Sequence, residues 1–148
     1  MRAVVQRVAR ASVTVAGETL GAIGHGYLVL LGVAATDTRA EAEKLWRKLA
    51  GLRINEDADG KTNLALADVD GAVLIVSQFT LMADCRRGRR PSFAAAGDPG
   101  HARDLYEYVV ELAQRDIQQV ETGEFAAHMQ VELVNDGPFT IVLDTDEL

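Results

Sequence analysis

Two short apolar runs constrain the fold of this chain more than any other feature of its sequence. Residues 27–33 and residues 72–76 contain no charged or amide side chain. Runs of this length without polar alternation are typical of strands that are buried on both faces of a sheet. We therefore expect a sheet in which these two strands are covered on both sides.

A helix is predicted after each of these strands. Thr38 lies three residues before Glu41, which is the spacing of a capping box, and apolar side chains then recur at helical spacing. In the second helix, Asp98 is the expected N-cap and Pro99 lies in the first turn. Other strands are predicted near residues 13–15, 117–120, 128–134 and 139–143. Strands in both hairpins and crossovers, with only two helices, indicate a single α/β domain with a mixed sheet over residues 1–148.

The charge of the chain argues against a general nucleic-acid-binding protein. Its formal net charge is −7, whereas contacts to phosphates require a positive surface. One local exception places four guanidinium groups close together, at Arg86, Arg87, Arg89 and Arg90. This cluster is expected either to touch nucleic acid over a small area, such as an end, or to be a solvated loop held by the protein's own carboxylates.

Several common kinds of site are not supported by the sequence. The histidines are too far apart for short metal-ligand spacing, and residues 55–60 resemble a calcium loop whose twelfth position is Leu66 instead of glutamate. No glycine-rich phosphate loop is present, and Cys85 is a lone cysteine with no adjoining histidine. We therefore expect no metal, no cofactor and no disulfide.

Nothing in the sequence predicts a membrane or secretory location. The longest strongly apolar stretch, residues 27–35, is too short to cross a bilayer. Glutamine and arginine interrupt the N-terminal residues, which therefore do not form a signal peptide. A cytoplasmic protein with no membrane partner is the expectation.

The first candidate site directly follows the second apolar strand. Ser77, Gln78, Phe79 and Thr80 would place hydroxyl, amide and backbone donors beside an aromatic face. Residues just past the end of a strand often contact ligands, because the strand fixes them while they remain accessible. A strand end that turns through polar residues is an equally ordinary explanation.

The second candidate site, residues 135–140, lies between the last two predicted strands. It contains Gly137 followed by Pro138. A cis bond between them would point two adjacent backbone carbonyls the same way, but only about 5–6% of X–Pro bonds are cis. A plain turn is the common alternative.

Together the two segments resemble the signature motifs of the D-aminoacyl-tRNA deacylase family, also described as D-tyrosyl-tRNA(Tyr) deacylases. The likeness reaches both ends of the chain, from residues 2–8 through 90–93, 105–106 and 123–125 to 129–131. Two separated motifs in the right order are much more specific than either alone. The chain departs from the family pattern at Ala126 and His128, outside both motifs.

The resemblance implies a three-layer α/β/β fold made of two strands, two strand–helix units and three strands. It also implies a homodimer with active sites at the subunit interface, in which a cis Gly137-Pro138 corner enters the partner's pocket. Gln78, Phe79 and Thr80 would be the catalytic residues of that pocket. The other residues implied in substrate binding are Ser77, Met129, Asn135 and Arg7, the last of which locks the orientation of the corner.

The activity implied by the resemblance is hydrolysis of the ester that joins a D-amino acid to the 3′ end of tRNA, a proofreading step in translation. An L side chain would be driven into the backbone of the corner, whereas a D side chain would point outward. Glycine has no side chain to exclude and is expected to pass this gate. The arginine cluster would contact phosphates of the tRNA acceptor end.

The residues themselves suggest how the ester is attacked. A Thr80 nucleophile would need a base, and no histidine or lysine adjoins either motif. We therefore expect the neighbouring ribose 2′-OH to assist the attack of water, while backbone N–H groups near Phe79 and Thr80 stabilise the oxyanion. The alternatives are a hydrolase of the same fold for another mischarged tRNA, and a non-catalytic RNA-binding domain.

Overall fold

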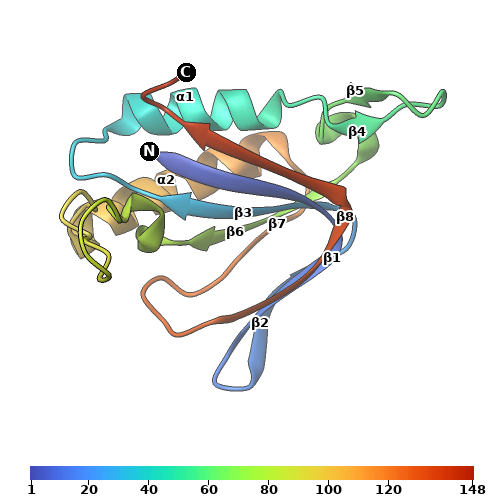
Figure 1. Cartoon of the computed structure of the whole chain (residues 1–148). Helices are drawn as coiled ribbons and strands as arrows, with labels where there is room; N and C mark the ends of the chain where they lie inside the picture. The colour runs from blue at the N-terminus through green and yellow to red at the C-terminus, as the bar shows by residue number, and fades with distance from the viewer.

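Both helices lie on the same face of a mixed sheet (Figure 1). The structure, a computed structural model, describes all of residues 1–148. In chain order its strands (β), α-helices (α) and short 3-10 helices (η) are β1 (Arg2–Val15), β2 (Glu18–Ile23), β3 (Gly26–Gly32), α1 (Arg39–Ala50), β4 (Asn55–Glu56), β5 (Thr62–Leu64), η1 (Ala67–Val69), β6 (Ala72–Ser77), η2 (Phe79–Met82), α2 (Pro99–Asp116), β7 (Val120–Thr122) and β8 (Gln130–Asp144).

The main sheet has the strand order β2-β1-β3-β6-β7, and β8 also pairs with β1. The β3–β6 and β6–β7 pairs are parallel, whereas β1 is antiparallel to β2, β3 and β8. Parallel neighbours require crossover connections, and α1 and α2 lie in these crossovers. The two apolar runs of the sequence are β3 and β6, which are buried on both faces as predicted.

A third layer forms because β1 changes partners halfway along its length. Residues 2–8 pair with β3, whereas residues 11–15 pair with β2. The second half of β1 curves away with β2 and the first half of β8, below the central strands in Figure 1. A second apolar cluster fills the space between these layers, with Val8, Ala11, Val13 and Ile23 against Leu28, Leu74 and Val76. The α/β/β architecture is therefore confirmed.

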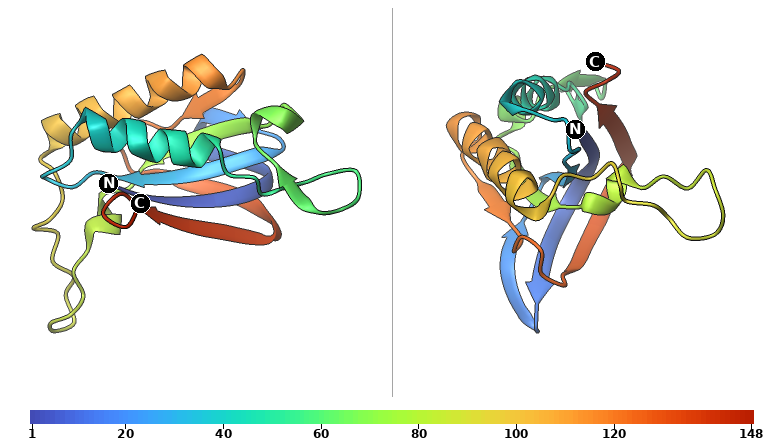
Figure 2. Two further views of the ribbon diagram at one scale, coloured as in Figure 1. Left: turned by 90° about the horizontal axis from the view of Figure 1, so that it is seen from above. Right: turned by 90° about the vertical axis from the view of Figure 1, so that its left-hand side faces the viewer.

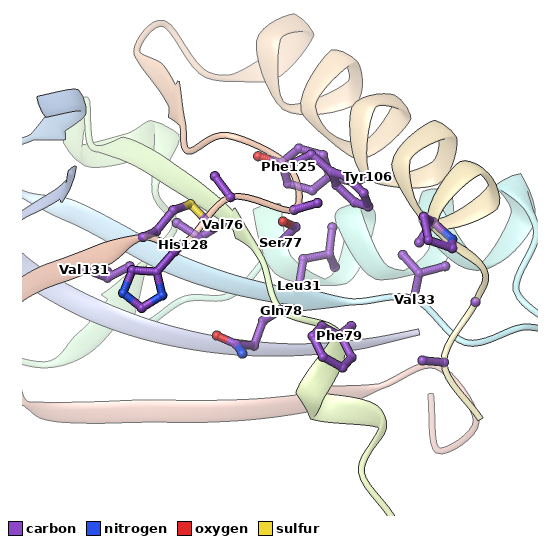
Figure 3. A pocket seen from close by; sticks show the side chains of 17 residues that line it. Leu31, Val33, Val76, Ser77, Gln78, Phe79, Tyr106, Phe125, His128 and Val131 are labelled. Carbon is purple, nitrogen blue, oxygen red and sulfur yellow. The ribbon is translucent and has the colours of Figure 1, made fainter. Parts of the chain in front are cut away.

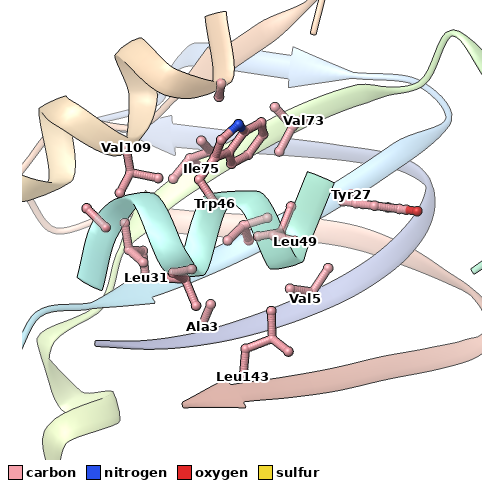
Figure 4. Packing of buried hydrophobic residues seen from close by; sticks show 14 of the residues in the cluster. Ala3, Val5, Tyr27, Leu31, Trp46, Leu49, Val73, Ile75, Val109 and Leu143 are labelled. Atoms are coloured by element: carbon pink, nitrogen blue, oxygen red, sulfur yellow. The ribbon is translucent and has the colours of Figure 1, made fainter. Parts of the chain in front are cut away.

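The helices cover the other face of the sheet and begin where the sequence predicts. Thr38 and Glu41 form the complete capping box of α1, and the Asp98 side chain caps α2 by accepting from the N–H groups of residues 100 and 101. Trp46 points from α1 toward Ile75 and Val73 of the sheet in Figure 4, and Leu49 belongs to the same buried cluster. Neither helix combines the length and the apolar composition that crossing a bilayer requires.

The C-terminal strands differ from the prediction. The sequence predicts two strands in residues 128–134 and 139–143, but the chain forms one strand, β8, over Gln130–Asp144. The register of its pairing with β1 shifts between Gln6 and Val8, so the residues between its halves bulge outward instead of turning back. The strand predicted at 117–120 also begins later, at Val120, because the N–H of Ile117 still bonds to Ala113 at the end of α2.

Candidate active site

The chain turns sharply where β6 ends. The backbone N–H of Gln78 donates to the Leu31 carbonyl at 2.8 Å, which continues the pairing of β6 with β3. The N–H of Leu81 then donates to the Gln78 carbonyl at 3.2 Å and starts η2. The first predicted segment is therefore a short turn that the interior of the sheet holds in place.

Gly32, at the end of β3, lies directly beneath this turn. A Cβ atom on Gly32 would lie 2.9 Å from the Leu81 Cβ atom and 3.0 Å from the Gln78 carbonyl oxygen. Both distances are too short for ordinary contacts, so any side chain at position 32 displaces the turn. The sequence analysis missed this residue, although a glycine that closes an otherwise aliphatic strand is a sign of close backbone approach.

Two backbone N–H groups at the start of η2 are free. The N–H groups of Phe79 and Thr80 donate no hydrogen bond within the chain, because no earlier turn of helix precedes them. The Thr80 hydroxyl accepts a hydrogen bond from the Gln78 side-chain amide and has no histidine or carboxylate partner. No set of three or more His, Cys, Asp or Glu side chains is arranged to hold a metal ion.

A pocket of about 490 Å³ opens beside the turn. Figure 3 shows it between the end of β6, the first turns of α2 and the segment that leads into β8. Four of the predicted site residues line it, namely Ser77, Gln78, Phe79 and Met129. Thr80 is exposed and not part of the lining, and the hydrogen bond from Gln78 to its hydroxyl links it to a residue that is.

Two aromatic residues that the sequence analysis did not assign to the site form one wall of the pocket. The Tyr106 and Phe125 ring centroids are 5.9 Å apart, and both residues line the cavity. The Tyr106 hydroxyl donates to the Ile75 carbonyl at 2.8 Å, and burial raises the pKa of this phenol to about 12. Tyr106 therefore stays protonated at neutral pH and is not a base.

The second predicted segment forms an exposed corner in the middle of β8. The Gly137–Pro138 peptide bond is cis, and both residues are exposed. The Asn135 side chain spans the corner, because its oxygen accepts from the Phe139 N–H at 2.7 Å and its nitrogen donates to the Thr140 hydroxyl at 2.9 Å. The corner therefore has a defined shape although it lies on the surface.

Arg7 supports this corner from below. Its side chain is buried, and its Nε donates to the Asp136 carbonyl at 2.9 Å. Its Nη1 donates to the Ile54 carbonyl at 2.6 Å, and its guanidinium group lies 4.9 Å from the centroid of the Phe139 ring. Arg7 thus connects the corner to the segment between α1 and β4.

Within one chain the turn and the corner lie far apart. The turn follows β6, and the corner belongs to β8, which is separated from β6 by β3 and β1. Three strand spacings amount to roughly 14 Å. The turn also lies level with Ala3 of β1, whereas the corner lies on Arg7, roughly 13 Å further along that strand. A ligand as small as an amino acid cannot touch both in a single chain.

The arginine cluster lies in a loop that projects from the molecule in both views of Figure 2. Backbone hydrogen bonds of 2.7 and 2.9 Å between Asp84 and Ser92 close the base of this loop. Arg86 folds back onto Asp84, with its Nη2 2.6 Å from the carboxylate, and this partner holds the pKa of Asp84 at about 2. The other three arginines, Arg87, Arg89 and Arg90, form no ion pair.

Comparison with known proteins supplies the family. A family model described as D-Tyr-tRNA(Tyr) deacylase matches residues 4–144. The D-aminoacyl-tRNA deacylase of Thermotoga petrophila is 56% identical over 148 residues, which cover 100% of this chain and 99% of that protein. The D-aminoacyl-tRNA deacylase of Anaeromyxobacter dehalogenans is 59% identical over 148 residues, with the same coverage of both chains.

Two solved structures share the fold of this chain. A structure titled c-Myc DNA Unwinding Element Binding Protein superposes with a TM-score of 0.93 at 43% identity and covers 97% of this chain and 98% of its own. A structure titled as a probable eukaryotic D-amino acid tRNA deacylase reaches a TM-score of 0.82 at 16% identity, covers 96% and 97% of the two chains, and supports the fold alone. Because the family model spans nearly the whole sequence and relatives are more than half identical over its full length, the chain belongs to the D-Tyr-tRNA(Tyr) deacylase family.

Proposed function

We propose that this chain hydrolyses the ester between a D-amino acid and the terminal adenosine of tRNA. The observation that carries the proposal is the apolar pocket beside a turn with two free backbone N–H groups. The names of relatives that are 56% and 59% identical support the substrate class. The test is deacylation of D-tyrosyl-tRNA and of L-tyrosyl-tRNA, with turnover expected on the D ester alone.

The pocket suits the terminal adenosine. Its volume of about 490 Å³ lies within the range of small-molecule sites, and most of its lining is apolar. Unpaired bases bind proteins by stacking on aromatic rings, which Tyr106 and Phe125 provide here. A base in this position would bring the ester of the ribose toward Phe79 and Thr80 at the mouth of the pocket.

The reaction we propose uses backbone groups and the substrate itself. The N–H groups of Phe79 and Thr80 stabilise the oxyanion that forms when water attacks the carbonyl. No base contacts the Thr80 hydroxyl, so the 2′-OH of the adenosine assists the water instead. A substrate that ends in 2′-deoxyadenosine should therefore show no turnover above the spontaneous rate. Full activity on that substrate would contradict this mechanism.

We further propose that the corner at Gly137 and Pro138 completes the pocket of a second copy of the chain. The separation of the corner from the turn within one chain, and its exposure, support this arrangement. Arg7 and Asn135 keep the corner in one shape, so it can exclude a substrate by contact with backbone atoms. An L side chain would meet the corner, whereas a D side chain would point away from it.

Mixed dimers test this arrangement directly. One chain carries Gly32→Ala, which disturbs the turn, and the other carries Arg7→Ala, which loosens the corner. A mixed dimer with shared sites has one site built from the intact turn of one chain and the intact corner of the other. Roughly a quarter of the wild-type sites are then restored after random mixing of two-fold dimers. Sites confined to one chain would give no recovery of D-selective turnover.

A second candidate function has one observation in its favour. The structural relative with 43% identity is titled a DNA unwinding element binding protein, which suggests nucleic-acid binding without chemistry. The same deacylation assay separates the two functions, because a binding protein would retain both tyrosyl esters intact. Hydrolysis of another mischarged tRNA, with both tyrosyl esters spared, would indicate a different substrate for the same fold.

A further inference from the structure

Two exposed aromatic side chains stand together at the mouth of the pocket. Phe79 is 58% exposed and Phe93 is 37% exposed. Their ring centroids are 5.0 Å apart with an angle of 66° between the ring planes. Phe79 also lines the pocket, whereas Phe93 lies outside it. The pair therefore extends from the lining of the pocket onto the surface.

The segment that carries Phe93 is fixed relative to the pocket. The N–H of Gly97 donates to the Val33 carbonyl at 3.0 Å, and the N–H of Ala35 donates to the Ala95 carbonyl at 3.0 Å. On the other side, Arg2 donates to the Leu81 carbonyl at 3.1 Å. These bonds attach the segment that carries Phe93, residues 81–97, at both of its ends. One end is attached to β1, and the other to the residues between β3 and α1, so Phe93 has a defined position.

The arginine loop extends from the same segment. Asp84 and Ser92 close its base, and Gly88, with a φ of +68°, forms its tip. The tip lies four positions after Asp84, which corresponds to a reach of roughly 13 Å for an extended chain. Arg87, Arg89 and Arg90 have no ion-pair partner although the protein carries a net charge of −7. This concentration of unpaired positive charge is complementary to phosphates.

We propose that Phe93 and the arginine loop bind the unpaired RNA strand that precedes the terminal adenosine. The base on the 5′ side of the adenosine stacks on Phe93. Arg87, Arg89 and Arg90 contact the phosphates of the nucleotides further toward the 5′ end. A single strand is favoured over the paired stem because only an unpaired base presents its face to an aromatic ring. The inference rests on the proposed function, since it takes the adenosine to occupy the pocket.

Binding is measured first, without any reaction. The probes are a fluorescein-labelled RNA hairpin with an unpaired 3′ ACCA and the same hairpin with a blunt end. We expect the wild-type protein to bind the ACCA hairpin at least about tenfold more tightly, and Phe93→Ala to remove that preference, because stacking of one base is worth about tenfold or more. Phe93→Tyr, which keeps a ring, should retain the preference, and Phe93→Leu should not.

The arginines are tested by salt dependence. Replacing Arg87, Arg89 and Arg90 together by alanine should lower the slope of log affinity against log salt by about 2 for the ACCA hairpin. Arg47→Ala is the matched control, because Arg47 is an exposed arginine on α1, outside this surface. Its salt slope should equal that of the wild type. An unchanged slope in the triple variant would overturn the role of the loop.

Turnover on substrates of increasing length then shows which nucleotide of the RNA contacts Phe93. The D-tyrosyl esters of adenosine, of a CCA trinucleotide and of whole tRNA are compared in Phe93→Ala and in the wild type. The ratio of kcat/KM on the trinucleotide ester to that on the adenosine ester should fall about tenfold in the variant, mainly through KM. An equal loss on all three esters would indicate a purely structural role for Phe93 and would overturn the inference.

The two proposals fail in different ways. Wild-type protein that prefers the ACCA hairpin but hydrolyses no D-tyrosyl ester would refute the proposed function and support the binding surface. Wild-type protein that hydrolyses D-tyrosyl-tRNA but binds both hairpins equally would refute the binding surface alone. If Phe93→Ala converts the protein from dimer to monomer but keeps the hairpin preference, Phe93 belongs to contacts between copies of the chain. That result would likewise refute the binding surface.

Discussion

The turn at residues 77–80 and the corner at residues 137–138 are held by different kinds of contact. The turn follows β6, whose first five residues are fully buried, and it rests on Gly32. The corner is exposed, and polar contacts from Arg7 and Asn135 give it its shape. Apolar packing therefore positions the half-site that we assign to catalysis, and hydrogen bonds position the half-site that we assign to selection.

This difference predicts two kinds of damage. A change beneath the turn should lower the rate on every substrate, because all of them use the same oxyanion donors. A change beneath the corner should instead alter the choice between substrates and leave the donors in place.

Gly32→Ala should have the largest effect. The new Cβ would displace the turn, and misplacement of one oxyanion donor typically lowers the rate by about 10²–10³. We expect kcat/KM on D-tyrosyl-tRNA and on glycyl-tRNA to fall by the same factor. Gly24→Ala is the matched control, because a Cβ there meets no atom within 4 Å. Wild-type rates in Gly32→Ala would show that the turn does not position the reacting groups.

Arg7→Ala should reduce selectivity more than rate. Without the guanidinium group the corner loses the bond to Asp136, and we expect the ratio of D to L turnover to fall at least about tenfold, which corresponds to one hydrogen bond to a charged group. The buried Ile54 carbonyl would also lose its donor, so urea denaturation should show a loss of about 1–3 kcal/mol in unfolding free energy.

The control for this variant is Arg10→Ala, since Arg10 is an exposed arginine on the same strand. It should leave both the selectivity and the stability unchanged. If Arg7→Ala lowers D and L turnover equally, the corner does not select between enantiomers.

Hydrolysis of glycyl-tRNA by the wild-type protein tests whether the corner excludes substrates through their side chains. Glycine has no side chain for the corner to exclude, so measurable hydrolysis is expected. L-alanyl-tRNA should react at least about tenfold more slowly, the lower end of what one methyl group contributes to discrimination. Complete resistance of glycyl-tRNA would argue against exclusion by a backbone corner.

Thr80→Ala should have a small effect if the substrate supplies its own assistance. The variant keeps the backbone N–H and loses only the hydroxyl that accepts from Gln78, so turnover within about tenfold of the wild type is expected. Single-turnover measurements on D-tyrosyl-tRNA test this. Total loss of activity, together with a trapped acyl-enzyme in the wild type, would instead identify Thr80 as the nucleophile.

Alkaline pH should lower the stability of the fold through one tyrosine near the corner and one near the turn. Burial raises the pKa of Tyr27, which pairs with Arg7 across β1 and β3, and the pKa of Tyr106, which lines the pocket, to about 12. In the unfolded chain both phenols ionise near pH 10, so the unfolded state releases its protons first as the pH rises. Stability should therefore be unaffected by these groups below pH 10 and should fall between about pH 10 and 12.

Urea denaturation at several pH values from 8 to 12 checks this expectation. The double variant Tyr27→Phe/Tyr106→Phe removes both phenols and should show a shallower decline over the same interval. An equally steep decline in the double variant would mean that other groups control the alkaline transition.

Local features of the fold follow closely from the sequence. The capping box at Thr38, the cap at Asp98 and the two apolar runs each depend on residues within a few positions of one another, and all four were predicted correctly. The last strands were predicted wrongly. Both halves of β8 pair with the long strand β1, which lies more than a hundred residues earlier, and this shared partner makes them one strand. A local pattern carries no information about such a partner.

The sequence by itself determined the family, the order of the main strands and helices as far as α2, and the two segments that carry the motifs. Only the tertiary structure decided that Met129 meets Ser77 and Phe79 in one pocket while Pro138 lies far from them in the same chain. The physical reason is that helix caps and strand patterns arise from contacts between near neighbours, whereas strand order is set by the burial of side chains from distant segments.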